Sequence, residues 1–333
     1  MQLEFSFIIP VYNRPDETLE LLQSFEALKT TTPFEIVIVE DGSTIPSKEV
    51  VAQFNSKLNI SYYFKENSGP GDSRNFGMQH AKGNYFIILD SDCILPANYL
   101  FEVEKSLKTD YVDCFGGPDA AHESFSDLQK AINFSMTSFL TTGGIRGNKK
   151  SVDTFQPRSF NMGISKEAFL KSGGFGRIHP GEDPDLSIRL WQLGYKTILI
   201  PEAFVYHKRR ISWQKFYKQV NKFGLVRPIL SVWHPSTKKI MYWFPTLFSL
   251  GLVLSVLLFF KIKLFLALYV LYYMVAFIAA FWETKNLKVA CFSIIAITVQ
   301  FFGYGYGFLK STLAVDVLKK NPESYFPNLF FKT

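Results

Sequence analysis

The chain has 333 residues, enough for one large domain or two smaller ones, and its aromatic content of 17% is high. Its basic residues, which give a formal charge of +7, gather between His207 and Lys239 without an RNA-binding signature, which argues against a nucleic-acid partner and for a membrane surface. The three cysteines, Cys93, Cys114 and Cys291, form no CxxC pair, which argues against a disulfide framework or a zinc site and fits a reducing compartment.

Short apolar runs alternate with amphipathic stretches up to about residue 205, which predicts an α/β fold with helices on both faces of a mainly parallel sheet. The N-terminus carries Glu4 and a short apolar run, so it is interpreted as a first strand and not as a signal peptide. Pro15 starts the first helix, where Leu19 and Leu22 share one face. In chain order we expect strands over residues 5–11, 34–41, 60–64 and 85–90, and helices over 14–28, 47–54 and 72–81.

Polar residues follow three of these strands, at Pro10–Asn13, Glu40–Ser43 and Asp90–Asp92. Ligands of parallel α/β sheets gather at the carboxyl ends of the strands, although no GxGxxG or P-loop motif occurs here. In extended backbone, Asp90 and Asp92 would leave the chain on the same side. Two such carboxylates suit Mg²⁺ or Mn²⁺ with positions left open for a diphosphate. A solvated turn would explain "DSD" equally well on its own.

More charged residues flank these strand ends. A glycine-rich loop with Asp72 and Arg74 comes directly before the DSD strand, and "GEDPD" supplies a second carboxylate pair, Glu182–Asp183. A helix ("LSIRLWQLG"), a strand ("YKTILI") and then His207 follow this pair.

The composition changes abruptly after Lys239. The runs 241–260 and 264–282 contain no charged residue, and each is long enough, at about 20 residues, to cross a bilayer. Neither has the polar stripe of a buried soluble helix. The run 289–309 is less apolar and has an unusual Gly/Tyr alternation. We predict two membrane crossings and a third segment that either crosses or re-enters.

These patterns predict four regions: a domain over residues 1–210 that carries the motifs above, a basic amphipathic interfacial segment over 211–240, transmembrane helices over 241–310 and a C-terminal tail over 311–333. The basic block before residue 240 places the N-terminal domain in the cytoplasm by the positive-inside rule. We therefore expect a multi-pass protein of the cell inner membrane, in contact with membrane lipid. The sequence leaves the oligomeric state open.

With these motifs in place, the chain resembles the family 2 glycosyltransferases, which have the GT-A fold. The resemblance covers residues 3 to about 210 and rests on an ordered set: PVYN, EDGS, GPGDSRN, LDSD, NMGISKEAF, GED and a final His. Each motif alone is weak, whereas the ordered set with this spacing is specific. The resemblance implies a nucleotide-sugar donor, a UDP-sugar by the family's habit, and Mn²⁺ or Mg²⁺ as cofactor.

The resemblance also implies roles for individual residues. Donor binding falls to Pro10, Tyr12, Asp41, Asp72, Arg74 and Asp90, metal binding to Asp92 and His207, and the acceptor side to Asn161, Met162 and Gly163. Read without the resemblance, His207 leads an exposed HKRR run. Likewise "SKEAFLKSGGF" is then an ordinary helix capped by Ser165 and ended by the pair Gly173–Gly174.

Elementary chemistry supports these roles. A nucleoside diphosphate leaves readily when a divalent ion neutralises its developing charge. The acceptor hydroxyl must lose a proton, and the GED motif supplies carboxylates that can take it. The family match favours Asp183 as the base, while Glu182 would position the acceptor or raise the pKa of Asp183. Direct attack from the opposite face implies inversion at the anomeric carbon.

The base also bears on the acceptor, because a polyprenyl phosphate is already anionic and needs little help. The motif therefore favours a hydroxyl of a lipid-linked saccharide in glycan or polysaccharide assembly. Processive relatives carry a QxxRW motif, which is missing from "SWQKFYKQVNKFGLVRPIL"; this favours the addition of one sugar at a time. That stretch is either an interfacial basic helix or a helix packed on the catalytic domain. The alternatives are a polyprenyl-phosphate glycosyltransferase and an inactive nucleotide-sugar-binding membrane subunit.

Overall fold

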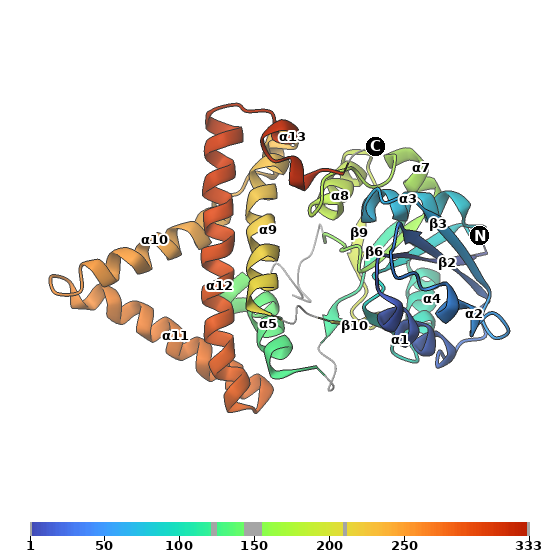
Figure 1. The fold of residues 1–333 in the computed structure, drawn as a ribbon, viewed down its shortest axis with the longest axis horizontal. Coiled ribbons are helices and arrows are strands. Elements are labelled where there is room, and N and C mark those ends of the chain that lie inside the picture. The colour runs from blue at the N-terminus through green and yellow to red at the C-terminus, as the bar shows by residue number, and fades with distance from the viewer. Residues whose placement is uncertain (1, 121–124, 143–154, 209–211, 332–333) are drawn as a thin grey trace. The chain divides into compact units, whose positions relative to one another are not determined.

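The computed structural model describes residues 2–120, 125–142, 155–208 and 212–331. The chain divides into two compact units (Figure 1). The first contains Met1–Ala120, Lys149–His207 and Phe330–Thr333, and the second contains Ala121–Asn148 and Lys208–Leu329.

The first unit is built on a seven-stranded sheet in the order β3-β2-β1-β4-β8-β6-β9. Its strands are β1 (Phe5–Val11), β2 (Phe34–Asp41), β3 (Ile60–Lys65), β4 (Tyr85–Leu89), β6 (Cys114–Gly116), β8 (Asn161–Ser165) and β9 (Thr197–Leu199). The strands β1 to β4 run parallel, whereas β8 is antiparallel to both β4 and β6. The predicted α/β fold with a mainly parallel sheet is confirmed, and β8 is the strand that makes it mixed.

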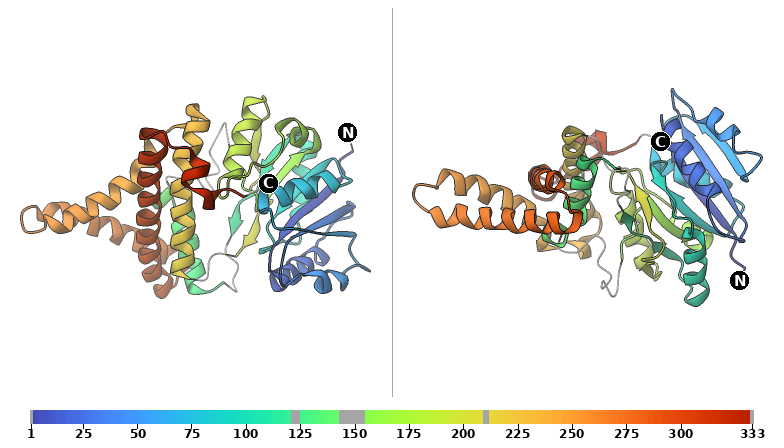
Figure 2. Two further views of the ribbon diagram at one scale, coloured as in Figure 1. Left: turned by 45° about the horizontal axis from the view of Figure 1, so that its top comes forward. Right: turned by 90° about the horizontal axis from the view of Figure 1, so that it is seen from below.

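Helices cover both faces of this sheet because successive strand residues point to opposite sides. On β1, Phe7 and Ile9 pack with α1 (Pro15–Glu26), α2 (Lys48–Ala52) and α4 (Tyr99–Thr109). Ile8 faces the other side, with α3 (Pro70–His80), α7 (Lys166–Ser172) and α8 (Glu182–Gln192). Both views in Figure 2 show this layering. The apolar strands are therefore buried on both faces, as their composition predicts.

A smaller sheet has the strand order β5-β10-β7. Its strand β5 directly follows β4 in the chain. The sheet consists of β5 (Cys93–Ile94), β7 (Asp119–Ala120) and β10 (Val205–His207). The pairing of β5 with β10 sets Cys93 opposite His207. The far end of the chain also belongs to this unit: of its described residues, Phe330 bridges to Ile178, and the Phe331 N–H donates to the Arg177 carbonyl at 3.1 Å.

Within the described residues, every regular element of the second unit is a helix. Its helices are α5 (Asp127–Thr137), α6 (Phe139–Thr142), α9 (Trp213–Trp233), α10 (Phe244–Leu257), α11 (Lys263–Thr284), α12 (Leu287–Ser311) and α13 (Pro322–Tyr325), with short 3₁₀ turns at Pro235–Thr237, Ile240–Trp243 and Pro327–Leu329 and a π-helical turn at Thr312–Val317. Three helices, Ile240–Leu257, Lys263–Thr284 and Leu287–Val317, are long and apolar enough to cross a membrane. The first uncharged run thus yields an α-helix of only 14 residues.

The Gly/Tyr alternation in α12 is explained by close helix packing. A side chain at Gly303 or Gly307 would collide with α9, and one at Gly305 would come within 2.9 Å of the Pro245 carbonyl oxygen. The approach of α9 is fixed by Asn221, whose Nδ2 donates to the Gly303 carbonyl at 2.9 Å. Glycine at alternate positions therefore lets α12 contact α9 on one side and α10 on another.

Candidate active site

The two aspartates of the DSD stretch follow β4 directly but face different partners. Asp90 Oδ1 accepts a hydrogen bond from Arg74 Nη2 at 2.7 Å, whereas Asp92 Oδ1 lies 3.2 Å from His207 Nε2. The chain turns here, since the Cys93 N–H donates to the Asp90 carbonyl at 3.2 Å. The same-side geometry expected for extended backbone therefore does not apply.

Arg74, in the second turn of α3, joins the DSD stretch to the GED stretch. Its side chain is 3% exposed, and its Nη1 donates to Glu182 Oε1 at 3.1 Å while its Nη2 holds Asp90. Phe175 lies against the guanidinium at 5.3 Å. Burial alone would lower the pKa of Arg74, but Asp90, Glu182 and Asp183 together raise it. One buried cation thus holds carboxylates from two distant parts of the chain.

Glu182 and Asp183 lie side by side in the first turn of α8, and their pKa values are shifted in opposite directions. Burial favours the neutral form of Glu182, but the His179 imidazole, 2.9 Å from its Oε1, and the Arg74 guanidinium outweigh burial and lower its pKa. For Asp183, burial and the adjacent charge of Glu182 raise the pKa, against a smaller lowering by Arg74. Asp183 Oδ1 is shielded and has no hydrogen-bond partner within the described ranges. A carboxylate with a raised pKa is suited to take a proton.

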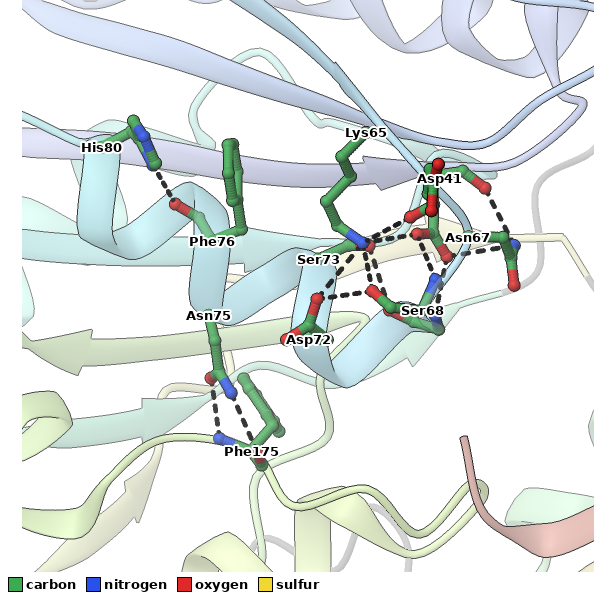
Figure 3. Close-up of polar contacts among 12 residues, drawn as sticks. Asp41, Lys65, Asn67, Ser68, Asp72, Ser73, Asn75, Phe76, His80 and Phe175 are labelled. Carbon is green, nitrogen blue, oxygen red and sulfur yellow. Dashed lines mark hydrogen bonds and ion pairs between the residues drawn. The ribbon is translucent and has the colours of Figure 1, made fainter. Parts of the chain in front are cut away.

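Asp41 ends β2, and its carboxylate is held by the loop that leads into α3 (Figure 3). Its Oδ1 accepts from Lys65 Nζ at 2.7 Å and from the Ser68 N–H at 3.0 Å, and its Oδ2 accepts from the Gly69 N–H at 2.9 Å. Asp72, which is exposed, lies 3.2 Å from the same lysine. Asp41 and Asp72 are therefore neighbours around one ammonium group.

The carboxyl end of β1 reaches the same edge of the sheet, because β1 and β2 are parallel and in register. Pro10 is partly buried, and Tyr12 is 52% exposed. Asn13 Oδ1 accepts from the N–H groups of Thr44 and Ile45 at 2.8 and 2.9 Å, which ties this end to the loop after β2. The predicted donor-binding residues of β1 and β2 are thus adjacent.

Three possible metal ligands converge beside β4. Atoms of Asp92, Cys93 and His207 lie within 4.8 Å of one another. The His207 ring stacks on Phe160 at 4.7 Å, which fixes its plane. A carboxylate and an imidazole at this spacing fit a divalent ion such as Mn²⁺. The predicted metal residues, Asp92 and His207, are therefore brought together.

The predicted acceptor-side residues lie on β8, and two of their side chains point into the protein. Asn161 and Met162 are fully buried. The Asn161 amide is satisfied by the Tyr99 hydroxyl at 2.6 Å and the Ala203 carbonyl at 2.7 Å. At Gly163 the side-chain space is filled by the Phe115 ring. A role for these residues at an acceptor site stays a prediction. Because the side chains of Asn161 and Met162 are buried, such a role would depend on where the β8 backbone lies.

Several residues at this site were not predicted from the sequence. Cys93 follows the predicted Asp92 in the chain, Lys65 ends β3, and His179 precedes Glu182 by three residues, in the segment before α8. A cavity of about 260 Å³ is lined by residues that include Ser68, Asp72, Phe175, His179 and Phe331. The position of Phe331 had no signal in the sequence, since it is more than 250 residues away from Gly69, which its ring covers.

Comparison with known proteins found both related sequences and similar solved structures. An uncharacterized glycosyltransferase of Rickettsia conorii is 39% identical over 105 residues, 32% of this chain and 17% of that protein. The chain spans less than a fifth of the length of that protein and of two further uncharacterized glycosyltransferases, from Rickettsia felis and Rickettsia bellii. Among solved structures, the mannosyltransferase PcManGT of Pyrobaculum calidifontis, in complex with GDP-Man and Mn²⁺, has a TM-score of 0.62 at 15% identity, over 93% of this chain and 87% of that one. Residues 1–349 of Staphylococcus aureus TarS with UDP-GlcNAc give 0.50 at 17% identity, over 92% and 91%.

These likenesses in structure establish the fold, a GT-A-like α/β domain followed by long apolar helices. The family follows from the sequence, because residues 6–171 match the model of Glycosyl transferase family 2. The matched segment contains β1 to β4, the Asp41 loop and the DSD stretch. The chain therefore contains a glycosyltransferase domain of family 2.

Proposed function

We propose that this protein is an inverting, metal-dependent glycosyltransferase that moves a sugar from a nucleotide-sugar, in the first place a UDP-sugar, to a hydroxyl of a lipid-linked saccharide. The observation that carries the proposal is the Arg74 bridge, in which one buried guanidinium holds Asp90 and Glu182 at 2.7 and 3.1 Å. It joins the strand ends where donors bind in α/β sheets to the helix that carries the base.

On the donor side, the exposed Tyr12 and the Asp41 loop offer an aromatic face and a carboxylate for the nucleoside. The proposed donor-binding residues are Pro10, Tyr12, Asp41, Asp72, Arg74 and Asp90. Asp92 and His207 would hold Mn²⁺ or Mg²⁺, which neutralises charge on the departing diphosphate. The solved complexes of PcManGT and TarS contain GDP-Man with Mn²⁺ and UDP-GlcNAc respectively, which supports a nucleotide-sugar as donor class.

On the acceptor side, Asp183 is the general base. Its carboxylate takes the hydroxyl proton as the acceptor oxygen forms a bond to the anomeric carbon. The bond between that carbon and the diphosphate oxygen breaks, and the nucleoside diphosphate leaves with the electron pair. Attack opposite to the leaving group inverts the anomeric centre. Glu182, held ionised by His179 and Arg74, keeps the pKa of Asp183 raised.

A base of this kind supports a hydroxyl acceptor over a lipid phosphate, which needs no deprotonation at neutral pH. The apolar helices support a lipid-linked saccharide as the carrier of that hydroxyl. With the basic residues that precede them, they also support a catalytic domain on the cytoplasmic side of the inner membrane.

The test is a donor panel with Mn²⁺ or Mg²⁺, followed by the variant Asp183→Asn. We expect Asp183→Asn to lower kcat by about 10²–10⁴-fold and to leave donor binding by calorimetry unchanged. Asp185→Asn is the matched control: its carboxylate, on the same helix, binds Arg189 at 2.9 Å, and it should keep turnover. If Asp183→Asn bound donor and turned over at the wild-type rate, the assignment of Asp183 as the general base would be wrong. If EDTA did not affect transfer, the proposed requirement for a metal ion would be wrong.

A further inference from the structure

The three apolar helices of the second unit differ in how much protein covers them. Within the apolar window of α11, 11% of residues are buried in the protein, and the figure for α10 with its preceding turn is 22%. For α12 it is 39%. Figure 1 shows α10 and α11 as a hairpin that projects from α12, while α12 lies alongside α9 and α5. The three helices are similar in composition, but they differ in how much of their surface the rest of the protein covers.

The middle of α12 is packed against two helices that are not apolar. On α5, Phe134 contacts the cluster with Ile297 and Phe301. On α9, Phe216 and Val220 share a cluster with Ala296, and Asn221 holds the Gly303 carbonyl at 2.9 Å. Trp213 of α9 meets Phe292 near the start of α12, at 5.9 Å. Helices α9 and α12 therefore run together along most of their lengths.

The outer face of α9 is basic. Lys215 and Lys218 are exposed, and Lys222 is partly exposed. If α12 crossed a bilayer, α9 would cross with it and would carry these lysines to the depth of the middle of α12. A lysine at the centre of a spanning helix strongly opposes insertion into the bilayer.

The hairpin has the opposite character. No charged residue occurs from 244 to 260 or from 264 to 282. Large apolar side chains are exposed around both helices: Leu247, Leu250, Val253, Leu257, Leu264, Leu268, Val270, Leu271, Met274 and Ile278. At the base, Trp243 and Trp282 have lysines close by in sequence, and Lys285 lies 4.4 Å over the Trp282 ring. Aromatic and basic residues at the end of an apolar stretch are typical of the headgroup level.

The surface that α12 leaves uncovered is a single narrow stripe. The exposed residues include Ile295 and Tyr306 of α12 and, in the π-helical turn that follows it, Leu313 and Val317. Lys310 is the exposed charged residue between Tyr306 and Leu313. A helix with one apolar stripe beside basic neighbours suits the plane of the interface, where the stripe meets acyl chains and lysines meet phosphates.

We propose that only the hairpin of α10 and α11 enters the hydrocarbon layer, and that α5, α9 and α12 lie together at the headgroup level. The partner of the hairpin surface is lipid acyl chains, and that of the lysine face of α9 is anionic headgroups. This arrangement does not depend on the sugar-transfer reaction, so its test is independent of the proposed function.

The test measures the depth of single spin labels on the full-length protein in phosphatidylcholine–phosphatidylglycerol vesicles. The background is Cys291→Ser, because the two remaining cysteines, Cys93 and Cys114, are buried. Labels replace Val270 in α11, Tyr306 in α12 and Lys218 in α9. We expect the Val270 label to collide mainly with oxygen, the Lys218 label mainly with a water-soluble nickel complex, and the Tyr306 label to lie at the boundary. A Lys218 or Tyr306 label as deep as the Val270 label would overturn the proposal.

A matched pair of lysine substitutions gives a second reading. Val270 and Tyr306 are 57% and 60% exposed, each along the length of an apolar helix. We expect Val270→Lys to reduce vesicle retention at least tenfold and Tyr306→Lys to leave it unchanged, with folding of both checked by circular dichroism in detergent. Equal losses would mean that α12 also lies in the hydrocarbon layer, and the proposal would be wrong.

Discussion

At the scale of single residues, Glu182 controls the proton affinity of its neighbour. Its negative charge, after burial itself, raises the pKa of Asp183. The variant Glu182→Gln removes that charge and frees Arg74 to attract Asp183, so both changes lower the pKa of Asp183. Because a general base works only when ionised, activity is lost as pH falls through this pKa. The acid limb of the kcat/KM profile should therefore move to lower pH in Glu182→Gln.

The measurement is a pH–rate profile of wild type, Glu182→Gln and the control Glu167→Gln. Glu167 is an exposed carboxylate paired with Lys171 in α7, and its variant should keep the wild-type acid limb. An acid limb that stays in place in Glu182→Gln, or moves to higher pH, would contradict the coupling between the two carboxylates.

The sequence could indicate which residues belong to the site but not how each is used. Glu40 and Asp41 are adjacent, yet Glu40 is fully buried and accepts from the Ser47 N–H at 2.8 Å. Asp41 alone meets the loop before α3. Asn161, which motif matching places at the acceptor, is buried in the sheet. Sequence spacing sets strand ends and helix starts, whereas hydrogen-bond partners depend on contacts between positions such as Arg74 and Glu182, 108 residues apart.

At the scale of elements, the loop before α3 depends on a glycine whose side-chain space is occupied. Gly69 has φ of +94°, and a Cβ there would lie 2.3 Å from ring atoms of Phe331. Gly69→Ala therefore combines backbone strain of about 1–3 kcal/mol with an overpacking cost of about 1–3 kcal/mol. Since the Gly69 N–H holds Asp41, we also expect a weaker affinity for nucleotide. Calorimetric unfolding and nucleotide titration measure the two effects.

Gly194 provides the matched control, with φ of +86° and open space around it. Gly194→Ala should show the backbone cost alone. The double variant Gly69→Ala/Phe331→Ala should recover the excess loss of Gly69→Ala, because the ring is then gone. If Gly69→Ala and Gly194→Ala were equally destabilised, the contact with Phe331 would have no energetic weight.

Elements were the most predictable level of this structure. The strands at Phe5–Val11 and Phe34–Asp41 have the expected bounds, and α7 has the expected Ser165 cap and Gly173 end. Continuous apolar runs and capping residues are local signals. Three features were not predictable from the sequence: the antiparallel direction of β8, the packing of α5 against α12, and the packing of α12 on α9. Each depends on partners from distant parts of the chain.

At the scale of the whole molecule, two kinds of force act between the protein and a bilayer. The net charge of +7 attracts anionic headgroups. Salt screens this attraction, so that at 0.1 M little of it remains beyond about 10 Å. Burial of the hairpin is a hydrophobic contribution, which salt does not weaken. The apolar surface is large and lacks charged residues from 244 to 260 and from 264 to 282, so we expect the hydrophobic contribution to determine retention.

This balance predicts how the full-length protein leaves a membrane. Washing vesicles of phosphatidylcholine and phosphatidylglycerol with molar salt should release almost none of the bound protein, whereas detergent should release nearly all of it, as measured by sedimentation. Neutral phosphatidylcholine vesicles should hold the protein as firmly once it is reconstituted, because the hairpin does not require charge. Release by salt alone would mean that the basic residues carry the attachment and that the hairpin is not embedded. The exposed side chains of α10 and α11 would then need a protein partner, since an apolar surface of this extent is not stable in water.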